Sequence, residues 1–208
     1  MIMEPSATLK PLLEKVRKYI NEAIIPLDQE FIDEINNNGR WQHSPRQKEI
    51  LDQLKQGARD QGLWNFFLTE GEHSSGICTV DYAVIAEETG YSALAAEVFN
   101  CSAPDTGNME VLAKYGSQAQ KDRWLEPLLN GEIRSAYAMT EPGEASSDAT
   151  NISMSAVLED GQWCLHGEKI WMFGAGDPRC KMLICMVKTD PKAARQQQNS
   201  QILAPTDS

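Results

Sequence analysis

Residues 137–148 read Tyr-Ala-Met-Thr-Glu-Pro-Gly-Glu-Ala-Ser-Ser-Asp. The residue before Pro142 is held extended and Gly143 frees the backbone that follows, so the run predicts a strand that ends in a turn. Thr140 would place a hydroxyl and an amide at the end of that strand. The small residues after the proline are Gly143, Ala145, Ser146 and Ser147. Because small side chains let backbone amides approach an anionic or polar ligand, we weigh a ligand-binding turn against a plain structural one.

The chain of 208 residues is acidic, with a formal net charge of −11 at pH 7. Nucleic acid and anionic membrane surfaces bind clustered Lys and Arg, so this balance argues against both as the main partner. No apolar stretch approaches the ~18 residues needed to span a bilayer. The first residues lack the features of a secretory signal, and Glu4 with a lone Arg17 suits a mitochondrial presequence badly. We expect a cytoplasmic protein, with the mitochondrial or peroxisomal matrix as the alternative.

The cysteines are five in number, with no Cys-x-x-Cys pair. An odd count without such pairs fits reduced thiols better than a disulfide framework. Free cysteine packs as a small hydrophobic residue, so we expect these thiols to be buried and structural.

Apolar residues spaced by three and four predict amphipathic helices in the first two-thirds of the chain. The expected helices are 6–37, 45–61, 79–100, 106–115 and 117–130. Pro26 should kink or break the first of them, and Gly90 is a weak point in the third. Ser117 and Gln120 have the spacing of a capping box.

After residue 133 the pattern changes to short apolar runs punctuated by Gly, Pro, Asp and Asn, which is typical of strands. The expected strands are 135–139, 152–158, 162–166, 182–188 and 202–204. Asp160-Gly161 suits a two-residue hairpin turn. Helices followed by strands predict an α+β chain with units 1–133 and 134–208.

The motifs resemble those of the acyl-CoA dehydrogenase family, which carries an aromatic-x-x-Thr-Glu-Pro-Gly run with Ser and Asp after it and a later Gly-x-Lys-x-Trp run. Here these are Tyr137–Gly143, then Ser146-Ser147-Asp148, then Gly167-Glu-Lys-Ile-Trp171. Further matches at 86–90 and 115–125 extend the resemblance in order over most of the chain. It implies an N-terminal helical domain, then an incomplete, β-barrel-like middle domain, with the C-terminal helical domain missing.

The resemblance also implies a cofactor, FAD. The residues carried over as lining it are Tyr137, Met139, Thr140, Gly143, Ser146, Ser147, Trp171, Met172 and Phe173. Ser147 would also lie near the acyl-CoA substrate.

Two departures from the common family pattern refine this interpretation. One extra residue between Gly143 and Asp148 is a spacing similar to that of the subgroup of acyl-CoA dehydrogenase family members 10 and 11. Met172-Phe173 stands where many relatives have Ile-Thr, and phenylalanine has no polar side-chain atom to hydrogen-bond a flavin. A backbone amide is the alternative donor.

The activity implied is FAD-dependent α,β-dehydrogenation of acyl-CoA thioesters in fatty-acid oxidation. In the family a glutamate takes the α-proton, and an electron-transferring flavoprotein accepts the electrons. Most relatives place that glutamate in the C-terminal domain, so we name no catalytic residue and expect a truncated oxidoreductase. A homo-oligomer is expected at full length. The alternatives are a non-catalytic assembly module of this fold, or a relative of the acyl-CoA oxidase or flavin monooxygenase type.

Other candidate sites carry weaker signals. Gly174-Ala175-Gly176 lacks the third glycine of a dinucleotide fingerprint and is expected to be a loop. The three histidines share no metal-ligand spacing with the cysteines, so no metal site is expected. No Gly-x-Ser-x-Gly elbow points to a hydrolase. Trp41 and Trp64 are expected in a core or an interface.

Overall fold

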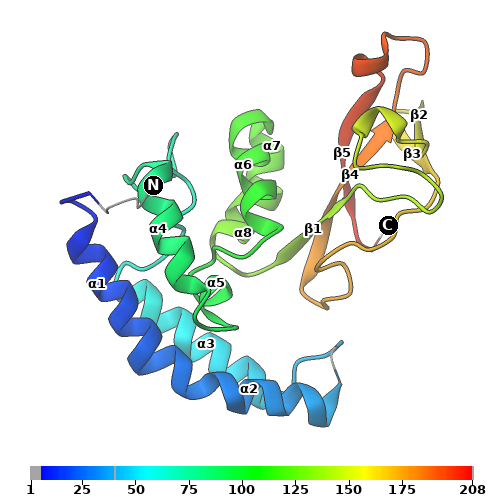
Figure 1. The fold of residues 1–208 in the computed structure, drawn as a ribbon. Helices are drawn as coiled ribbons and strands as arrows, with labels where there is room; N and C mark the ends of the chain where they lie inside the picture. The colour runs from blue at the N-terminus through cyan, green and yellow to red at the C-terminus, as the bar shows by residue number, and fades with distance from the viewer. Residues whose placement is uncertain (1–5, 40, 208) are drawn as a thin grey trace. The chain divides into compact units, whose positions relative to one another are not determined.

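Helices and strands are segregated along the chain, helices before residue 131 and strands after it (Figure 1). The computed structural model describes residues 6–39 and 41–207. The chain divides between Gly131 and Glu132 into two compact units, called here the helical unit and the sheet unit. The α+β class is confirmed, and the division falls two residues before the boundary expected from the sequence.

The first expected helix is one continuous helical run with a widened turn inside it. Helix α1 (Lys10–Tyr19) passes into a π-helical segment, Ile20–Ile24, and then into α2 (Ile25–Asn38). Pro26 has no N–H to donate and its ring crowds the carbonyl four residues earlier, so the turn before it opens from the α to the π pattern. Gly39 ends the run with φ +85°.

The same relation recurs at the end of the helical unit. Helix α6 (Asp105–Tyr115) is followed by α7 (Gln118–Gln120), a π-helical segment at Lys121–Leu125 and α8 (Glu126–Leu129). The π segment again ends two residues before a proline, Pro127. The capping box at Ser117 and Gln120 is confirmed.

The prediction of one long helix over 79–100 was wrong. The structure has α4 (Thr79–Thr89) and a separate short α5 (Ala95–Val98). Gly90 ends α4, and the Ser92 hydroxyl accepts a hydrogen bond from the Leu94 amide at 3.1 Å, which starts a new turn. Short polar side chains of this kind compete with helix continuation.

Helix α3 (Pro45–Asp60) begins at a second capping box, which the sequence analysis missed although Ser44 and Gln47 have the right spacing. Helices α1 to α5 of the unit enclose an apolar core. Its largest fully buried members include Leu9, Ile20, Ile24, Ile50, Leu63, Ile85 and Phe99.

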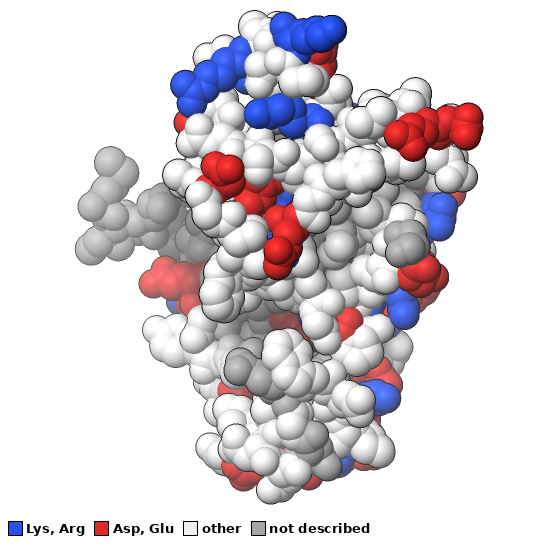
Figure 2. Space-filling model, turned by 90° about the vertical axis from the view of Figure 1, so that its right-hand side faces the viewer, with Lys and Arg blue, Asp and Glu red and all other residues white. Residues whose placement is uncertain are grey.

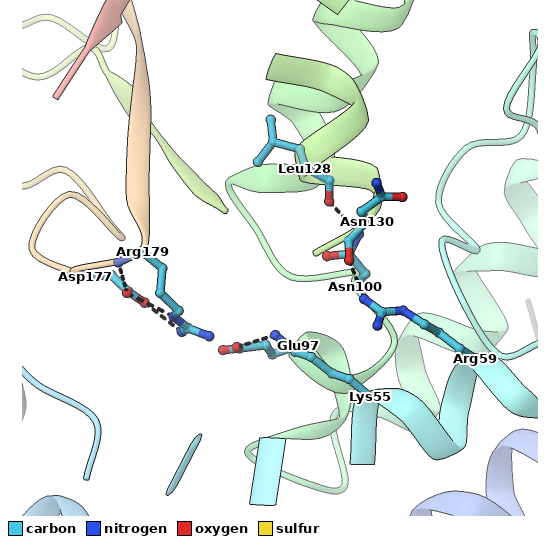
Figure 3. A network of polar contacts seen from close by, with 8 residues as sticks. All are labelled: Lys55, Arg59, Glu97, Asn100, Leu128, Asn130, Asp177 and Arg179. Carbon is cyan, nitrogen blue, oxygen red and sulfur yellow. Dashed lines mark hydrogen bonds and ion pairs between the residues drawn. The ribbon is translucent and has the colours of Figure 1, made fainter. Parts of the chain in front are cut away.

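A polar network lies beside this core (Figure 3). Asn100 has φ +54° and its amide donates to Asn65 Oδ1 at 2.7 Å and to the Leu128 carbonyl at 2.9 Å. Arg59 donates to the carbonyl of Asn130. These bonds satisfy carbonyls at the end of α8 that the helix leaves unpaired, so they fix the connector after α3 to α8.

The sheet unit has five strands in a curled, incomplete barrel-like sheet. They are β1 (Arg134–Ala138), β2 (Ser155–Glu159), β3 (Gln162–His166), β4 (Cys180–Lys188) and β5 (Asn199–Pro205). The Asp160-Gly161 hairpin turn between β2 and β3 is confirmed by φ values of +49° and +80°.

Strand β4 organises the sheet. Strand β5 pairs antiparallel along one of its edges from Met182 to Lys188. The other edge is shared, because β1 pairs parallel as far as Cys185 and β2 pairs parallel only at Lys188. The chain therefore leaves the sheet after β1 and returns to the same edge at β2, and the intervening loop holds the Thr-Glu-Pro-Gly run.

Charged side chains of both signs are interspersed with neutral ones on the face that Figure 2 shows. The net charge of −11 is thus not gathered into one acidic field on that face.

A tight contact in the helical unit gives a stability prediction. A Cβ added at Gly57 would lie 2.5 Å from Tyr19 Oη, which donates to the Leu54 carbonyl at 2.7 Å. We expect Gly57→Ala to lower the free energy of unfolding by about 1–3 kcal/mol through overpacking. In a Tyr19→Phe background the same change should be neutral or stabilise by up to about 1 kcal/mol, because alanine favours helix. Urea unfolding of the four proteins measures this, and additive effects would contradict it.

Candidate functional site

The loop between β1 and β2 is built around a buried carboxylate, that of Glu141, which is 4% exposed. Its Oε2 accepts hydrogen bonds from the Ser153 amide and hydroxyl, both at 2.7 Å. Its Oε1 accepts from the Met154 amide at 2.9 Å and from Lys169 Nζ at 2.8 Å. A buried carboxylate needs partners of this number, and here each oxygen has two.

Hydrogen bonding sets the ionisation of this group. Burial on its own raises the pKa of Glu141, but the hydrogen bonds from Lys169, Ser153 and Met154 favour the charged form and together lower it to about 2. Glu141 is therefore an anion at neutral pH. Its oxygens are occupied by the protein's own donors, which agrees with a structural role for this residue.

Lys169 joins the second motif to the first. Its ammonium donates to the Met139 carbonyl at 3.0 Å as well as to Glu141, and the Ile170 amide donates to the Thr140 carbonyl at 2.9 Å. Two consecutive residues of one motif thus bond to consecutive residues of the other. The Thr-Glu-Pro-Gly run and the Gly-x-Lys-x-Trp run lie side by side for this reason.

Gly167 is required by close approach. It has φ +149°, and a Cβ there would lie 2.7 Å from Met154 Cγ and 3.0 Å from Met154 Cα. The backbone at 167 therefore contacts the segment that supplies an amide to Glu141.

Ser146 closes the turn from the other side. The Glu141 amide donates to Ser146 Oγ at 3.0 Å, and Ser146 is buried. Ser147 and Thr140 are exposed, and Gly143, also exposed, has φ +80° with open space where a Cβ would stand. Of the residues expected to face a cofactor in this run, Ser146 thus has its hydroxyl committed within the loop.

Asp148, the last residue of the run, caps the short turn Ala149–Asn151. Hydrogen bonds from the Thr150 hydroxyl and amide lower the pKa of Asp148, with a further contribution from the charge of Arg195. Arg195 Nε also donates to Thr150 Oγ1 at 2.9 Å. The end of the motif is thereby fixed to the loop before β5.

The aromatic residues of the second motif are open to solvent. Trp171 is 83% exposed and Phe173 is 85% exposed. Met172 between them is half-buried and packs against the apolar cluster that includes Ala138, Ala156 and Cys185. Of the three residues expected at a flavin ring, the structure turns two side chains outward and one into the sheet's core.

Trp171 has φ +57°, in the left-handed region that disfavours residues with a Cβ. Such conformations carry strain and concentrate at functional sites. The strain at Trp171 coincides with 83% exposure of the residue, so packing in a core does not account for it.

Tyr137 and Met139 lie at the start of the site and are both half-buried. Burial raises the pKa of Tyr137, whose hydroxyl accepts a hydrogen bond from Gln201 Nε2 at 3.2 Å. Met139 takes part through its carbonyl, which accepts from Lys169.

Sequence reasoning missed Ser153, which supplies two of the four hydrogen bonds to Glu141. No motif marks it, because it falls near the start of the expected strand 152–158, where a serine carries no particular signal. The sequence motifs also assigned no separate role to Lys169. The Gly-x-Lys-x-Trp run marks the position of Lys169, but its spacing does not identify Glu141 as the partner, which the structure shows.

The remaining candidates have simple roles. Gly174-Ala175-Gly176 lies in a turn, as expected. Within residues 6–39 and 41–207, no group of three or more His, Cys, Asp and Glu side chains could hold a metal ion. Trp64 is half-buried and donates to the Leu129 carbonyl at 2.8 Å. Trp41 is exposed, which excludes a place in the core, and the interface alternative for it stays a prediction. A tryptophan in a polar loop has no apolar neighbours in sequence to draw it inward.

The five cysteines are all free thiols. Cys180 and Cys185 are buried, as expected, and burial raises the pKa of the half-buried Cys101 to about 11. The expectation of burial was wrong for Cys78, which is exposed at the start of α4.

The two units each match a known protein domain. Residues 6–132 match the N-terminal domain of acyl-CoA dehydrogenases, and residues 136–208 match the middle domain. The chain belongs to the acyl-CoA dehydrogenase family.

Similar proteins include acyl-CoA dehydrogenase family member 10 of Mus musculus, 46% identical over 208 residues, which cover 98% of this chain and 19% of the relative. A putative acyl-CoA dehydrogenase from Mycobacterium abscessus has a solved structure with a TM-score of 0.89, at 44% identity, covering 99% of this chain and 52% of that one. The FAD complex of PigA has a TM-score of 0.72 at 22% identity, covering 99% and 49%, and shares the fold alone.

The chain thus spans about half the length of these solved relatives and about a fifth of family member 10. The expected similarity to the subgroup of members 10 and 11 is confirmed by the identities of 46% and 44%. Among the described residues, no helix combines the length and the apolar character needed to cross a membrane.

Gly167 offers a test of the close approach in this acyl-CoA dehydrogenase site. We expect Gly167→Ala to lower the free energy of unfolding by about 2 kcal/mol or more, because it adds backbone strain to a contact with Met154. Gly143→Ala is the matched control, with a positive φ but open space, and should cost about 1 kcal/mol. Urea unfolding compares them, and equal losses would mean that the contact at 167 is unimportant.

Glu141 offers a test by pH. Its pKa is lowered from 4.5 to about 2 in the folded chain, so its stabilisation is complete above pH 4.5 and is lost as the pH falls toward 2. The shift corresponds to about 3 kcal/mol. Glu141→Gln should cost about 3–5 kcal/mol at pH 7, because it leaves buried Lys169 without its counter-charge.

Urea unfolding of wild type and Glu141→Gln between pH 7 and pH 2.5 should show the stability gap narrowing below pH 4.5. Glu144→Gln, which neutralises an exposed acid of the same loop, is the matched control. A Glu141→Gln gap that is independent of pH would contradict the assigned ionisation.

Proposed function

We propose that the sheet unit binds FAD at the surface formed by the two motifs. The residues proposed to line it are Tyr137, Met139, Thr140, Gly143, Ser146, Ser147, Trp171, Met172 and Phe173. The observation that carries the proposal is the position of Trp171, which is strained and 83% exposed. It directly follows Lys169 and Ile170, whose hydrogen bonds to residues 139–141 hold the backbone of Thr140. An exposed aromatic residue that directly follows Ile170, whose amide holds the backbone of the hydroxyl-bearing Thr140, suits a flat, polar-edged heterocycle.

The residues present fit such a ligand. Trp171 and Phe173 offer aromatic surface, Thr140 and Ser147 offer exposed hydroxyls, and Gly143 leaves open space at the turn. Met172 and Ser146 would contribute through their backbone, since the Met172 side chain packs into the core cluster and the Ser146 hydroxyl accepts from Glu141. Phe173 would contribute ring contact in place of a hydroxyl.

The proposed reaction of the whole protein is α,β-dehydrogenation of an acyl-CoA thioester in fatty-acid oxidation. FAD, when bound, supplies the acceptor for hydride. The part of this chain is to hold and orient the cofactor and to present Ser147 toward the acyl-CoA. Glu141 is unsuited as the base, because its carboxylate is buried and each oxygen already accepts two hydrogen bonds. We assign the base to no residue of residues 1–208.

The partners proposed are an acyl-CoA, an electron-transferring flavoprotein and further copies of the protein in a homo-oligomer. A cytoplasmic location, with the mitochondrial or peroxisomal matrix as alternatives, stays a prediction. A non-catalytic assembly module and an oxidase- or monooxygenase-type relative are the rival functions. They differ in outcome, since the first needs no flavin and the second needs it with a different substrate.

FAD binding is tested by titrating the 208-residue chain and following the absorbance and fluorescence of the flavin. We expect saturable binding that Trp171→Leu weakens about tenfold or more, since stacking on an aromatic ring contributes about 1–3 kcal/mol. Trp163→Leu is the matched control, an exposed tryptophan of the same unit outside the motifs, and should leave the dissociation constant unchanged.

Equal weakening by both substitutions would refute the assignment of Trp171. No binding by wild type at high micromolar FAD, with the sheet unit folded by circular dichroism, would refute the cofactor proposal and favour the assembly module.

A further inference from the structure

The buried ion pair of Glu141 and Lys169 joins three separate segments of the sheet unit. Lys169 comes from the loop after β3, Glu141 from the loop after β1, and the amides of Ser153 and Met154 from the approach to β2. The side chains of Lys169 and Glu141 are 4% and 3% exposed. Neither reaches solvent, so neither is expected to touch a bound ligand.

We propose that Lys169 is a positioning residue for the cofactor surface, which couples Thr140 to Trp171 without contact to the ligand. The inference rests on the proposed FAD site. It adds that cofactor affinity depends on a lysine buried beneath that site.

The coupling follows from the order of the bonds. Lys169 Nζ holds the Met139 carbonyl at 3.0 Å and the Glu141 carboxylate at 2.8 Å, on either side of Thr140. The next residue, Ile170, donates its amide to the Thr140 carbonyl at 2.9 Å. Trp171 follows at once. The position of its strained backbone relative to Thr140 is therefore set by these three bonds.

A buried ion pair fixes the position of one motif relative to the other more selectively than apolar packing would. Removing two charges from water is costly, and the cost is offset only when geometry is good and the remaining hydrogen-bonding sites are filled. A shift of one motif along the other would break the Lys169–Glu141 ion pair and leave a buried charge without its partner. Such a shift is thereby disfavoured far more than it would be between two apolar side chains, which tolerate shifts.

The test compares wild type with Lys169→Met and the double variant Glu141→Gln/Lys169→Met. Lys181→Met is the control, since Lys181 is an exposed lysine on β4. Hydrogen–deuterium exchange of the ligand-free chain reports on peptides that contain residues 139–147 and 168–173. FAD titration gives the dissociation constant, and thermal unfolding gives stability.

We expect Lys169→Met to speed exchange in both peptides and to weaken FAD binding about tenfold or more, the size typical of outer hydrogen-bond partners of a bound group. The double variant leaves no unpaired buried charge, so it should regain most of the lost melting temperature. Its FAD affinity should stay low, because the Met139 carbonyl and the motif register remain without the lysine. Lys181→Met should match wild type in all three measurements.

Wild-type exchange in Lys169→Met would overturn the proposal, as would a double variant that regains both stability and affinity, because the lysine would then matter for folding alone. If wild type binds no FAD, the proposed function fails separately. Exchange in the ligand-free chain still decides whether Lys169 couples the two motifs.

Discussion

A carboxylate that is shut away from water must find a donor for each lone pair, and in the sheet unit that requirement falls on Glu141. The donors are the Ser153 amide and hydroxyl, the Met154 amide and the Lys169 ammonium. They come from two segments far from Glu141 in sequence. The hydrogen bonds to the Glu141 carboxylate therefore hold the loop between β1 and β2 against the loop after β3. Apolar contacts alone would define this arrangement less precisely.

The rigid interior supports an outer layer that is exposed and strained. Thr140 and Trp171 face solvent, while their immediate neighbours Glu141 and Ile170 are held by buried or backbone bonds. Positive φ at a tryptophan persists only where surrounding bonds over-determine the backbone. The hydrogen bonds of Lys169 and Ile170 to residues 139–141 supply these constraints. Buried interactions thus hold the exposed backbone at Trp171 in a conformation that it would not adopt by itself.

The sequence predicted much of the fold because helix period, strand punctuation and turn chemistry are local. Pro26 signalled a disturbance in the first helix, but only the structure shows that it takes the form of a π turn before the proline. The alanines around Gly90 favour helix and so predicted one helix over 79–100, whereas Ser92 starts a new turn there. The residues of the candidate site were predicted from the motifs. The role of Ser153 was not, since it arises from tertiary contact alone.

The spacing of Gly-x-Lys-x-Trp has a physical explanation in this geometry. In an extended chain, side chains two apart point to the same face, so Lys169 and Trp171 would share one environment. Lys169 is instead buried and Trp171 is 83% exposed. The left-handed φ of +57° at Trp171 breaks the alternation and releases its ring to the surface. Gly167 permits the approach to Met154 that brings the lysine under the first motif. Gly167 thus allows the close approach of the loop to Met154, and Lys169 fixes the loop to the first motif through hydrogen bonds. The positive φ at Trp171 then directs the Trp171 side chain to the surface.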